Sequence, residues 1–517
     1  MPNEKRSFRA GLGVLCVLIC CTAGLYGLSI DPIGANLLSQ VTTNLNGAGV
    51  QVAQAEAGSP NWQVNPAAVG QSPGLFTYFS SSGSSSSFPN ALGSESGHAD
   101  AVGSFFYGIP GGVATNFAHI DNYEASYFAL TVVPTLMPII DSVVNQSFVF
   151  GGTSTSEQQV IDSTYDNYAS QYPTLFVSGA GNSGPVSPPA TCYNGIAVGA
   201  YGGSSSVGPT PDNARAKPDI TAPAAVTSFS TPQVAGAAAV LRQAALRGDG
   251  GNNTNAAADP RTLKALLLNG AVKPADWAAP SPSPLDPRYG AGVLNVFNSY
   301  KQLAGGKHTF VLATTIPAGN LHPPPAATGA VNSLSGWDSN TISSSVINDA
   351  VNHYFFNVSN SLNSASFTAT ATLVWNRQLN QASINKLALF LYDANTGSLL
   401  TSSTSAVDNV QHIFLPKLPT GRYDLQVVKT GGVSVSNAET YALAFEFFAM
   451  PLTIKKSGNN VLLTWPIYPD GFVLESTPSL TSPTWATVNT TPTIVNNQNQ
   501  VTLASTAPTQ FFRLRRP

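Results

Sequence analysis

The segment "ITAPAAVTSFSTPQVAGAAAVL", residues 220–241, places the hydroxyl side chains of Ser228, Ser230 and Thr231 in front of a run of small apolar residues. Small residues let a helix pass through a packed core, and Pro232 suits the first turn of such a helix, where a missing N–H costs least. Ser228 would then lie near the positive end of the helix dipole, which favours a developing oxyanion. Taken alone, the segment favours an N-cap serine over a nucleophile.

Short apolar runs alternate with helical patterns from about residue 46 to residue 306. Ser154 and Glu157 have the spacing of a capping box at the start of one of the helices. The alternation predicts a parallel sheet with helices on both faces, and a ligand site beyond the carboxyl ends of its strands. Strands are predicted at residues 49–56, 117–123, 141–150, 174–182 and 195–201, and helices at 98–108 and 154–172.

The composition and hydrophobic pattern of the chain change at two places. The Ser-rich segment 80–97 is of low complexity, and we predict a solvated loop without chemistry there. Beyond Gly306 a Pro-rich linker leads into alternating strand patterns, with a hairpin turn signal at "NTG", residues 395–397. We therefore expect an antiparallel β-sandwich domain at 307–450 and a small β module at 451–517.

Composition and the first residues indicate an exported protein. Only 9% of residues are charged and the net charge is −3, which argues against a nucleic-acid partner. Basic residues precede an apolar run that ends near residue 28, and this favours a cleaved signal peptide at 1–28 over an uncleaved anchor. Cleavage leaves no stable membrane partner. Three of the four cysteines lie in this segment, so the processed chain keeps only Cys192 and forms no internal disulfide.

A serine nucleophile needs a base within hydrogen-bond reach, and the base needs an orienting carboxylate. Of the six histidines, only His98 and His119 precede residue 306. His119 lies inside a predicted strand, where a satisfied core or surface histidine is expected. His98 instead begins a predicted helix, from which its imidazole can face the edge of the sheet. Glu56 ends the strand 49–56 and is the candidate acid, with an exposed strand-end carboxylate as the alternative.

Several motifs in this region of the chain resemble those of the subtilisin-like serine peptidases, the subtilases. "VTSFSTPQVAG" is similar to the serine block of that family, and "KPDITAPA" before it is similar to the stretch that leads up to the block. "HADAVGS" resembles the histidine block more loosely. The chain order Glu56, His98, Ser228 is the family's order of acid, histidine and serine. The resemblance covers about residues 46–306.

The resemblance implies a site and a mode of substrate binding. Ser228 is the implied nucleophile, His98 the base, Glu56 its orienting acid, and Asn182 in "VSGAGNSG" the oxyanion donor together with the N–H of Ser228. Ser230 takes the family's alanine position and is not a rival nucleophile. An extended substrate is implied to pair with two edge segments, whose glycines also suit tight turns. These segments contain Ser147, Phe148, Gly179, Ala180 and Gly181.

The sequence also departs from the family pattern. Glu56 stands where the family has aspartate, and Asp100 is a second candidate acid, although residues two apart do not share a helix face. Val226 replaces a glycine, and the short segment before it predicts a substrate cleft that has lost part of its wall. The resemblance allows structural calcium, but no contiguous ligand loop is present to assign it, and no other cofactor is implied.

The C-terminal segments "NKLALFLYDANTG" and "LPTGRYDLQVV" resemble the pre-peptidase C-terminal β-sandwich of secreted bacterial peptidases. We expect Trp465 and Trp485 to lie in the core of the small C-terminal module rather than to form a glycan-binding site. The whole pattern predicts a secreted, monomeric bacterial endopeptidase that acts on polypeptides. The alternative is an inactive subtilase-like scaffold that binds extended peptide or matrix. A purely structural surface protein fits the composition but not the ordered motifs.

Overall fold

The computed structural model describes residues 32–274, 276–325, 330–359, 367–432, 435–449, 452–466, 472–481, 483–495, 498–505 and 509–515. The predicted signal peptide, residues 1–28, lies outside the described residues. Among the described residues, no helix is long and apolar enough to cross a membrane.

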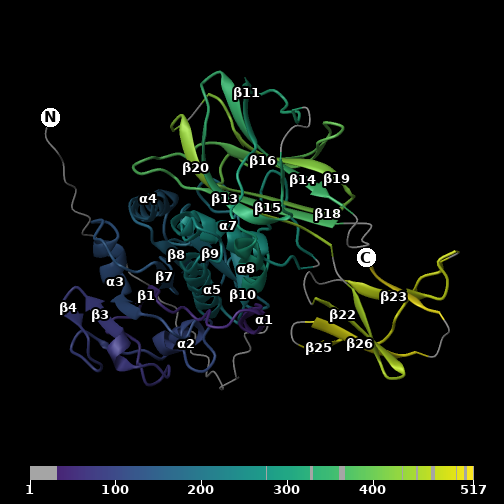
Figure 1. Ribbon diagram of the computed structural model, residues 1–517. Helices are drawn as coiled ribbons and strands as arrows, with labels where there is room; N and C mark the ends of the chain where they lie inside the picture. The colour runs from purple at the N-terminus through teal and green to yellow at the C-terminus, as the bar shows by residue number, and fades with distance from the viewer. Residues whose placement is uncertain are drawn as a thin grey trace.

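The first part of the chain is built around one sheet of eight strands (Figure 1). All neighbouring strands run parallel except the edge pair β3 and β4. The central strand β1 therefore has β6 on one side and β7 on the other. In spatial order the strands are β10 (Ile220–Pro223), β9 (Ile196–Tyr201), β8 (Leu175–Gly179), β7 (Val143–Gln146), β1 (Gln51–Glu56), β6 (His119–Glu124), β3 (Phe76–Ser80) and β4 (Gly83–Ser85).

Alternate residues of the strands supply two separate apolar cores, because successive side chains of a strand point to opposite faces. Val52 and Val143 pack with α2, α5, α7 and α8 on one face, whereas Ala53 and Val144 pack with α3, η2 and α4 on the other. The predicted parallel sheet with helices on both faces is thus confirmed. The helices are α1 (Ala35–Val41), η1 (Pro73–Leu75), α2 (Gly97–Phe106), α3 (Ala125–Tyr127), η2 (Phe128–Val132), α4 (Thr155–Gln171), α5 (Thr227–Arg247), α6 (Thr254–Ala257), α7 (Pro260–Gly270) and α8 (Val296–Ala304).

Two local predictions are confirmed and one is wrong. The capping box is present at the start of α4, where Ser154 and Glu157 bond each other's backbone N–H. The hairpin turn is present before β17 (Leu399–Ser403), with Gly397 at φ 72°. Residues 80–97 are not only loop. They contain β4, which pairs with β3, and β5 (Ser94–Glu95), which pairs with β2 (Asn61–Gln63), because serine-rich chain can still form backbone ladders at a sheet edge.

The chain continues into two antiparallel sheets that face each other. Their inner faces form a third apolar core, with Tyr354, Trp375, Leu389, Tyr441 and Phe445 fully buried in it. One sheet has the order β11-β14-β19-β16-β17, with β12 beside β14, and the other has the order β13-β20-β15-β18. The strands are β11 (Leu312–Pro317), β12 (Val331–Asn332), β13 (Ser335–Ser343), β14 (Asn348–Val358), β15 (Phe367–Trp375), β16 (Leu387–Asp393), β17 (Leu399–Ser403), β18 (Val410–Leu418), β19 (Gly421–Lys429) and β20 (Ala438–Phe448).

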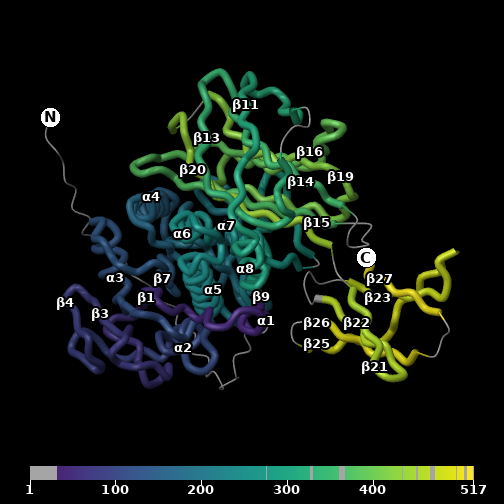
Figure 2. The backbone as a smooth tube through the Cα atoms, in the orientation of Figure 1, coloured from purple at the N-terminus to yellow at the C-terminus, as the bar shows by residue number. Residues whose placement is uncertain are grey.

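Two small sheets at the C-terminal end of the chain form a last β module. Figure 2 shows this module beside the β-sandwich. Trp465 is buried in its small core together with Leu463, as predicted for that tryptophan. Trp485 instead lies under the Arg513 guanidinium, 4.3 Å from the ring centroid. The strands are β21 (Thr453–Ser457), β22 (Asn460–Pro466), β23 (Val473–Thr477), β24 (Ala486–Thr487), β25 (Thr493–Val495), β26 (Gln498–Ala504) and β27 (Phe511–Arg515).

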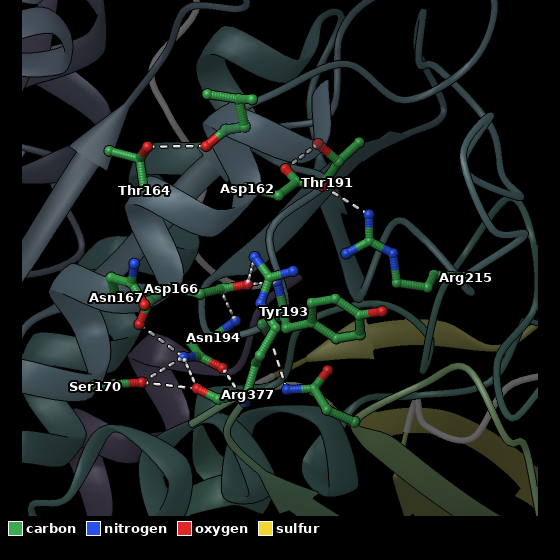
Figure 3. A network of polar contacts seen from close by, with 12 residues as sticks. Asp162, Thr164, Asp166, Asn167, Ser170, Thr191, Tyr193, Asn194, Arg215 and Arg377 are labelled. Atoms are coloured by element: carbon green, nitrogen blue, oxygen red, sulfur yellow. Dashed lines mark hydrogen bonds and ion pairs between the residues drawn. The ribbon is translucent and has the colours of Figure 1, made fainter. Parts of the chain in front are cut away.

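The β-sandwich is docked against the α/β part through buried polar contacts (Figure 3). Arg377 of the sandwich pairs with Asp166 of α4 at 2.7 Å and lies over the Tyr193 ring, with 4.9 Å to its centroid. The backbone of Arg377 also exchanges two hydrogen bonds with the Asn194 side chain. Arg215 covers the same Tyr193 ring at 4.2 Å. The tyrosine is therefore held by two guanidinium groups, one from each side of the domain boundary.

These docking contacts lie far from the carboxyl ends of the central strands. Asp166 lies near the end of α4, which leads into the amino end of β8, and Tyr193 precedes the amino end of β9. The residues that follow β1, β7 and β8 lie at the opposite edge of the sheet, because parallel strands share one direction. The sandwich is thus anchored away from the predicted site.

Candidate active site

Glu56 and His98 are brought into direct contact. Glu56 is the last residue of β1, and its side chain is 1% exposed. His98 is the second residue of α2, a helix whose N-cap Ser96 accepts a hydrogen bond from the Ala99 N–H. The Glu56 Oε2 and His98 Nδ1 atoms are 2.9 Å apart. A buried carboxylate at one ring nitrogen leaves Nε2 as the nitrogen available to a substrate or a nucleophile.

The electrostatics of this pair favour a basic imidazole. Burial opposes the charge on His98, but the charge of the Glu56 carboxylate and its hydrogen bond outweigh burial and raise the pKa of His98 above its usual value. The His98 side chain keeps 29% of its surface exposed. The imidazole is therefore oriented by the Glu56 carboxylate and still accessible to solvent, as a general base must be.

Ser228 lies in the first turn of α5, and the contact of this turn with His98 is made by the neighbouring residue rather than by Ser228 itself. The ring of the next residue, Phe229, has its centroid 6.2 Å from that of His98 and stacks on Phe105 of α2. Val226 is the N-cap of α5, so Ser228 is the second residue of the helix. The alternative of an N-cap serine is thereby excluded, since the cap residue precedes the first helical residue.

The Ser228 carbonyl receives its hydrogen bond from outside the helix. Pro232 is the sixth residue of α5 rather than part of its first turn, and its missing N–H deprives the Ser228 carbonyl of its normal helix partner. Ser147, directly after β7, supplies the replacement, because its Oγ donates to the Ser228 carbonyl at 3.0 Å. Ser147 is thus a support for the serine turn as well as part of a predicted substrate edge.

Asn182 is tied to the same turn by its side-chain oxygen. Its Oδ1 accepts hydrogen bonds from the N–H of Thr227 at 2.9 Å and from the Thr227 hydroxyl at 2.8 Å. An amide whose oxygen is occupied presents its NH2 group on the other side. Asn182 is exposed, and its NH2 group makes no hydrogen bond with the described residues. An NH2 group without a partner is available as an oxyanion donor, and that role stays a prediction.

The other hydroxyls of the serine segment are structural. Ser230 and Thr231 are fully buried and both donate to the Thr227 carbonyl, at 3.1 Å and 2.6 Å. Further along α5 the helix is buried on all sides, as its small residues predict. A Cβ at Gly236 would lie 2.7 Å from the Cβ of Val113, which explains the need for glycine there.

The predicted substrate edges follow β7 and β8. Phe148 packs in the core beneath the sheet, and its ring meets Phe150 edge-on. Gly179 faces α5, where a Cβ would come within 3.1 Å of the Thr231 hydroxyl. Ala180 is buried, and Gly181 has a φ of 103°, which favours glycine. Close packing and a turn therefore account for both glycines, while their role as a substrate edge stays a prediction.

The remaining candidates have other partners. His119 Nε2 bonds Thr77 Oγ1 at 3.0 Å and Asp121 at 3.1 Å, so it is a satisfied histidine, as predicted. Asp100 Oδ1 accepts from the Asn65 N–H at 2.7 Å, on a different side of α2 from Glu56. Within the described part of the chain, no group of three or more His, Cys, Asp or Glu side chains is arranged to hold a metal ion.

The short segment before α5 packs against a neighbouring loop. The Ser204 N–H donates to the Ala225 carbonyl at 2.8 Å, and Ser204 forms an isolated bridge with Val226. A Cβ at Gly203 would meet the Ala224 carbonyl at 2.1 Å. The residues that replace the longer family segment are thus fixed on the loop after β9.

Two buried residues next to Glu56 were missed by sequence reasoning. Gln54 Nε2 donates to Glu56 Oε1 at 2.9 Å, and the Tyr107 hydroxyl donates to Gln54 Oε1 at 2.6 Å. The period of two in β1 places Gln54 and Glu56 on one face, and this was the available signal. Nothing in the sequence indicates Tyr107, because it comes from the end of a different element.

Comparison with known proteins gives a partial match. The model of the subtilase family matches residues 135–295, a segment that contains Ser147, Asn182 and Ser228 but neither Glu56 nor His98. No curated protein matches the sequence.

Among solved structures, the prenylagaramide maturation protease PagA is 20% identical, with a TM-score of 0.38 over 53% of this chain and 99% of that one. Tripeptidyl peptidase 2 is 14% identical, with a TM-score of 0.31 over 74% of this chain and 43% of that one. The match of the subtilase family model to residues 135–295 and the parallel sheet with helices on both faces give the α/β region of this protein a subtilisin-like fold.

Proposed function

We propose that the protein is an exported serine endopeptidase whose triad is Glu56, His98 and Ser228. The observation that carries the proposal is the 2.9 Å contact between the buried Glu56 carboxylate and His98 Nδ1, next to the helix turn that presents Ser228. A structural ion pair does not need an accessible second ring nitrogen, whereas a general base does.

In this mechanism His98 Nε2 removes the proton of the Ser228 hydroxyl as Oγ attacks the scissile carbonyl carbon. The carbonyl oxygen gains the negative charge, and it is stabilised by the Asn182 NH2 group and the Ser228 N–H. His98 then gives its proton to the leaving amine, which breaks the C–N bond and leaves an acyl-enzyme. Water, deprotonated by His98, hydrolyses that ester and restores Ser228.

The substrate is a polypeptide in extended form. We infer that it pairs its backbone with the edges around Ser147 and Phe148 and around Gly179 to Gly181, because Ser147 bonds the Ser228 carbonyl and Gly179 faces Thr231 in the same helix. The basic and apolar first residues support export. The β-sandwich, which resembles the pre-peptidase C-terminal type, serves as an anchored companion domain, and the chain acts as a monomer.

The test is hydrolysis of an internally quenched peptide library by the full chain and two variants. Ser228→Ala removes the attacking oxygen, and turnover should fall by at least about 10³. Ser230→Ala removes a buried hydroxyl two residues away and is the matched control, which should stay active. A folded wild-type protein that binds extended peptides without cleaving them would instead establish the inactive scaffold.

A further inference from the structure

We propose that Gln54 and Tyr107 are positioning residues that hold the longer glutamate side chain in place, so that its Oε2 faces His98. This inference rests on the proposed function, in which Glu56 orients the catalytic histidine. It assigns a role to two fully buried polar side chains that the triad itself does not use.

The carboxylate of Glu56 has a partner at each oxygen. His98 Nδ1 is 2.9 Å from Oε2, and Gln54 Nε2 is 2.9 Å from Oε1. Gln54 is 0% exposed and Glu56 is 1% exposed. A glutamate has one more rotatable bond than the aspartate of the family pattern, and two opposed hydrogen bonds remove the freedom that this bond adds.

The direction of the Gln54 amide is fixed by two further contacts. Its Oε1 accepts from the Tyr107 hydroxyl at 2.6 Å, and its Nε2 also donates to the Ala99 carbonyl at 2.9 Å. A reversed amide would turn its oxygen toward two acceptors, Ala99 O and Glu56 Oε1. The NH2 group is therefore directed at Glu56, where it donates to Oε1 and holds the side chain in place.

The same contacts join β1 to the helix that carries the histidine. Ala99 is the neighbour of His98 in α2, and Tyr107 is the C-cap of that helix. Gln54 thus bonds α2 near its start and at its end, while Glu56 bonds His98 itself. Burial raises the pKa of Tyr107 well above its usual value, so its hydroxyl stays protonated and remains a donor. Gln54 therefore fixes the position of the acid, Glu56, relative to the base, His98.

The test uses Tyr107→Phe in the full chain, which removes the hydroxyl and keeps the ring. We expect kcat to fall about tenfold with KM unchanged, since one hydrogen bond is lost and the substrate edges are untouched. We also expect the acidic limb of the pH profile to move to lower pH, because a less well aligned Glu56 raises the His98 pKa less.

Tyr78→Phe is the matched control. Tyr78 is buried in the same core, and its hydroxyl donates to the Val64 carbonyl at 2.8 Å. The two variants should lose similar thermal stability, and only Tyr107→Phe should change kcat and the acidic limb. Equal effects of both variants on kcat, or an unchanged Tyr107→Phe enzyme, would overturn the positioning role.

An NMR titration of the His98 imidazole separates this inference from the proposed function. A lower His98 pKa in Tyr107→Phe than in the wild type supports positioning even in a chain that cleaves nothing. An inactive wild type would refute the peptidase proposal alone, whereas an unchanged His98 pKa in the variant would refute the positioning role alone.

Discussion

At the residue scale, the acid of the site is a glutamate where the family pattern has an aspartate. The extra methylene is accommodated because Glu56 ends a buried strand and both carboxylate oxygens meet a donor. We expect Glu56→Gln to reduce kcat/KM by about 10⁴, the cost of an isosteric loss of this carboxylate in a serine triad. Steady-state kinetics on a quenched peptide measures this loss. An active Glu56→Gln enzyme would mean that another group orients His98.

The pH dependence gives a second prediction for the same pair. His98 must be neutral to act as a base, and Glu56 raises the pKa of His98. Activity is therefore lost as pH falls through that raised pKa. In Glu56→Gln the cause is removed, so the acidic limb of the residual kcat/KM profile should move to lower pH. A limb that stays in place would assign it to a different group.

Asp100 carries a separate prediction about stability. Burial, together with the neighbouring Glu95 carboxyl group, raises the pKa of Asp100 to about 7, although the Asn65 N–H opposes the rise. A raised carboxyl pKa means that the folded state loses stability as pH rises from about 4, the ordinary carboxyl pKa, to about 7, and this loss is complete above that range. Asp100→Asn keeps the acceptor for Asn65 and offers an NH2 group to Glu95. Its melting temperature should exceed that of the wild type at pH 8 and match it near pH 4.

At the element scale, the start of α5 depends on a partner from outside the helix. Pro232 leaves the Ser228 carbonyl without its helix donor, and Ser147 fills the gap. Ser147→Ala should therefore cost about 1–3 kcal/mol, the penalty of an unsatisfied partly buried carbonyl. In a Pro232→Ala background the restored N–H bonds that carbonyl, so the added cost of Ser147→Ala should shrink. Denaturant unfolding of the wild type, the two single variants and the double variant completes the cycle, and additive effects would contradict the account.

Elements with strong local signals are predictable from sequence, and those fixed by distant partners are not. The capping box of α4, the hairpin turn at Gly397 and the apolar run of α5 each announce themselves within a few residues. The strands within residues 80–97 escape such reasoning, because their pairing depends on β2 and β3 rather than on β-branched residues. Ser228 was placed near the correct helix end, but only the backbone shows that Val226 is the cap.

At the scale of the whole molecule, the α/β part and the β-sandwich share a buried polar boundary. Arg377 joins Asp166, Tyr193 and Asn194, residues that precede it by 183 positions or more. No local pattern predicts contacts over such a separation. The candidate site is likewise assembled from residues far apart in the chain. Its motifs could be predicted because each is a local pattern. The contacts of Gln54 and Tyr107 could not, because they join different elements.

Loss of Arg377 should weaken this boundary. Arg377→Ala leaves the Asp166 carboxylate buried without its cation, and breaking such a pair costs about 3–5 kcal/mol. Arg288→Ala is the matched control, because Arg288 is 47% exposed and its nearer carboxylate, that of Asp276 at 2.9 Å, is 59% exposed, while the buried Asp286 carboxylate is 3.7 Å away. That change should cost about 1 kcal/mol or less. Equal denaturant midpoints for the two variants would show that the boundary adds no stability.

The central claim is that Glu56 and His98 activate Ser228. The most direct measurement is mass spectrometry of the full chain after treatment with a fluorophosphonate probe, followed by mapping of the labelled peptide. The account predicts one label per chain on Ser228, and a label that disappears in Ser228→Ala and is slowed strongly in His98→Ala. A folded wild-type protein that remains unlabelled, or one labelled at Ser230 or elsewhere, would contradict it.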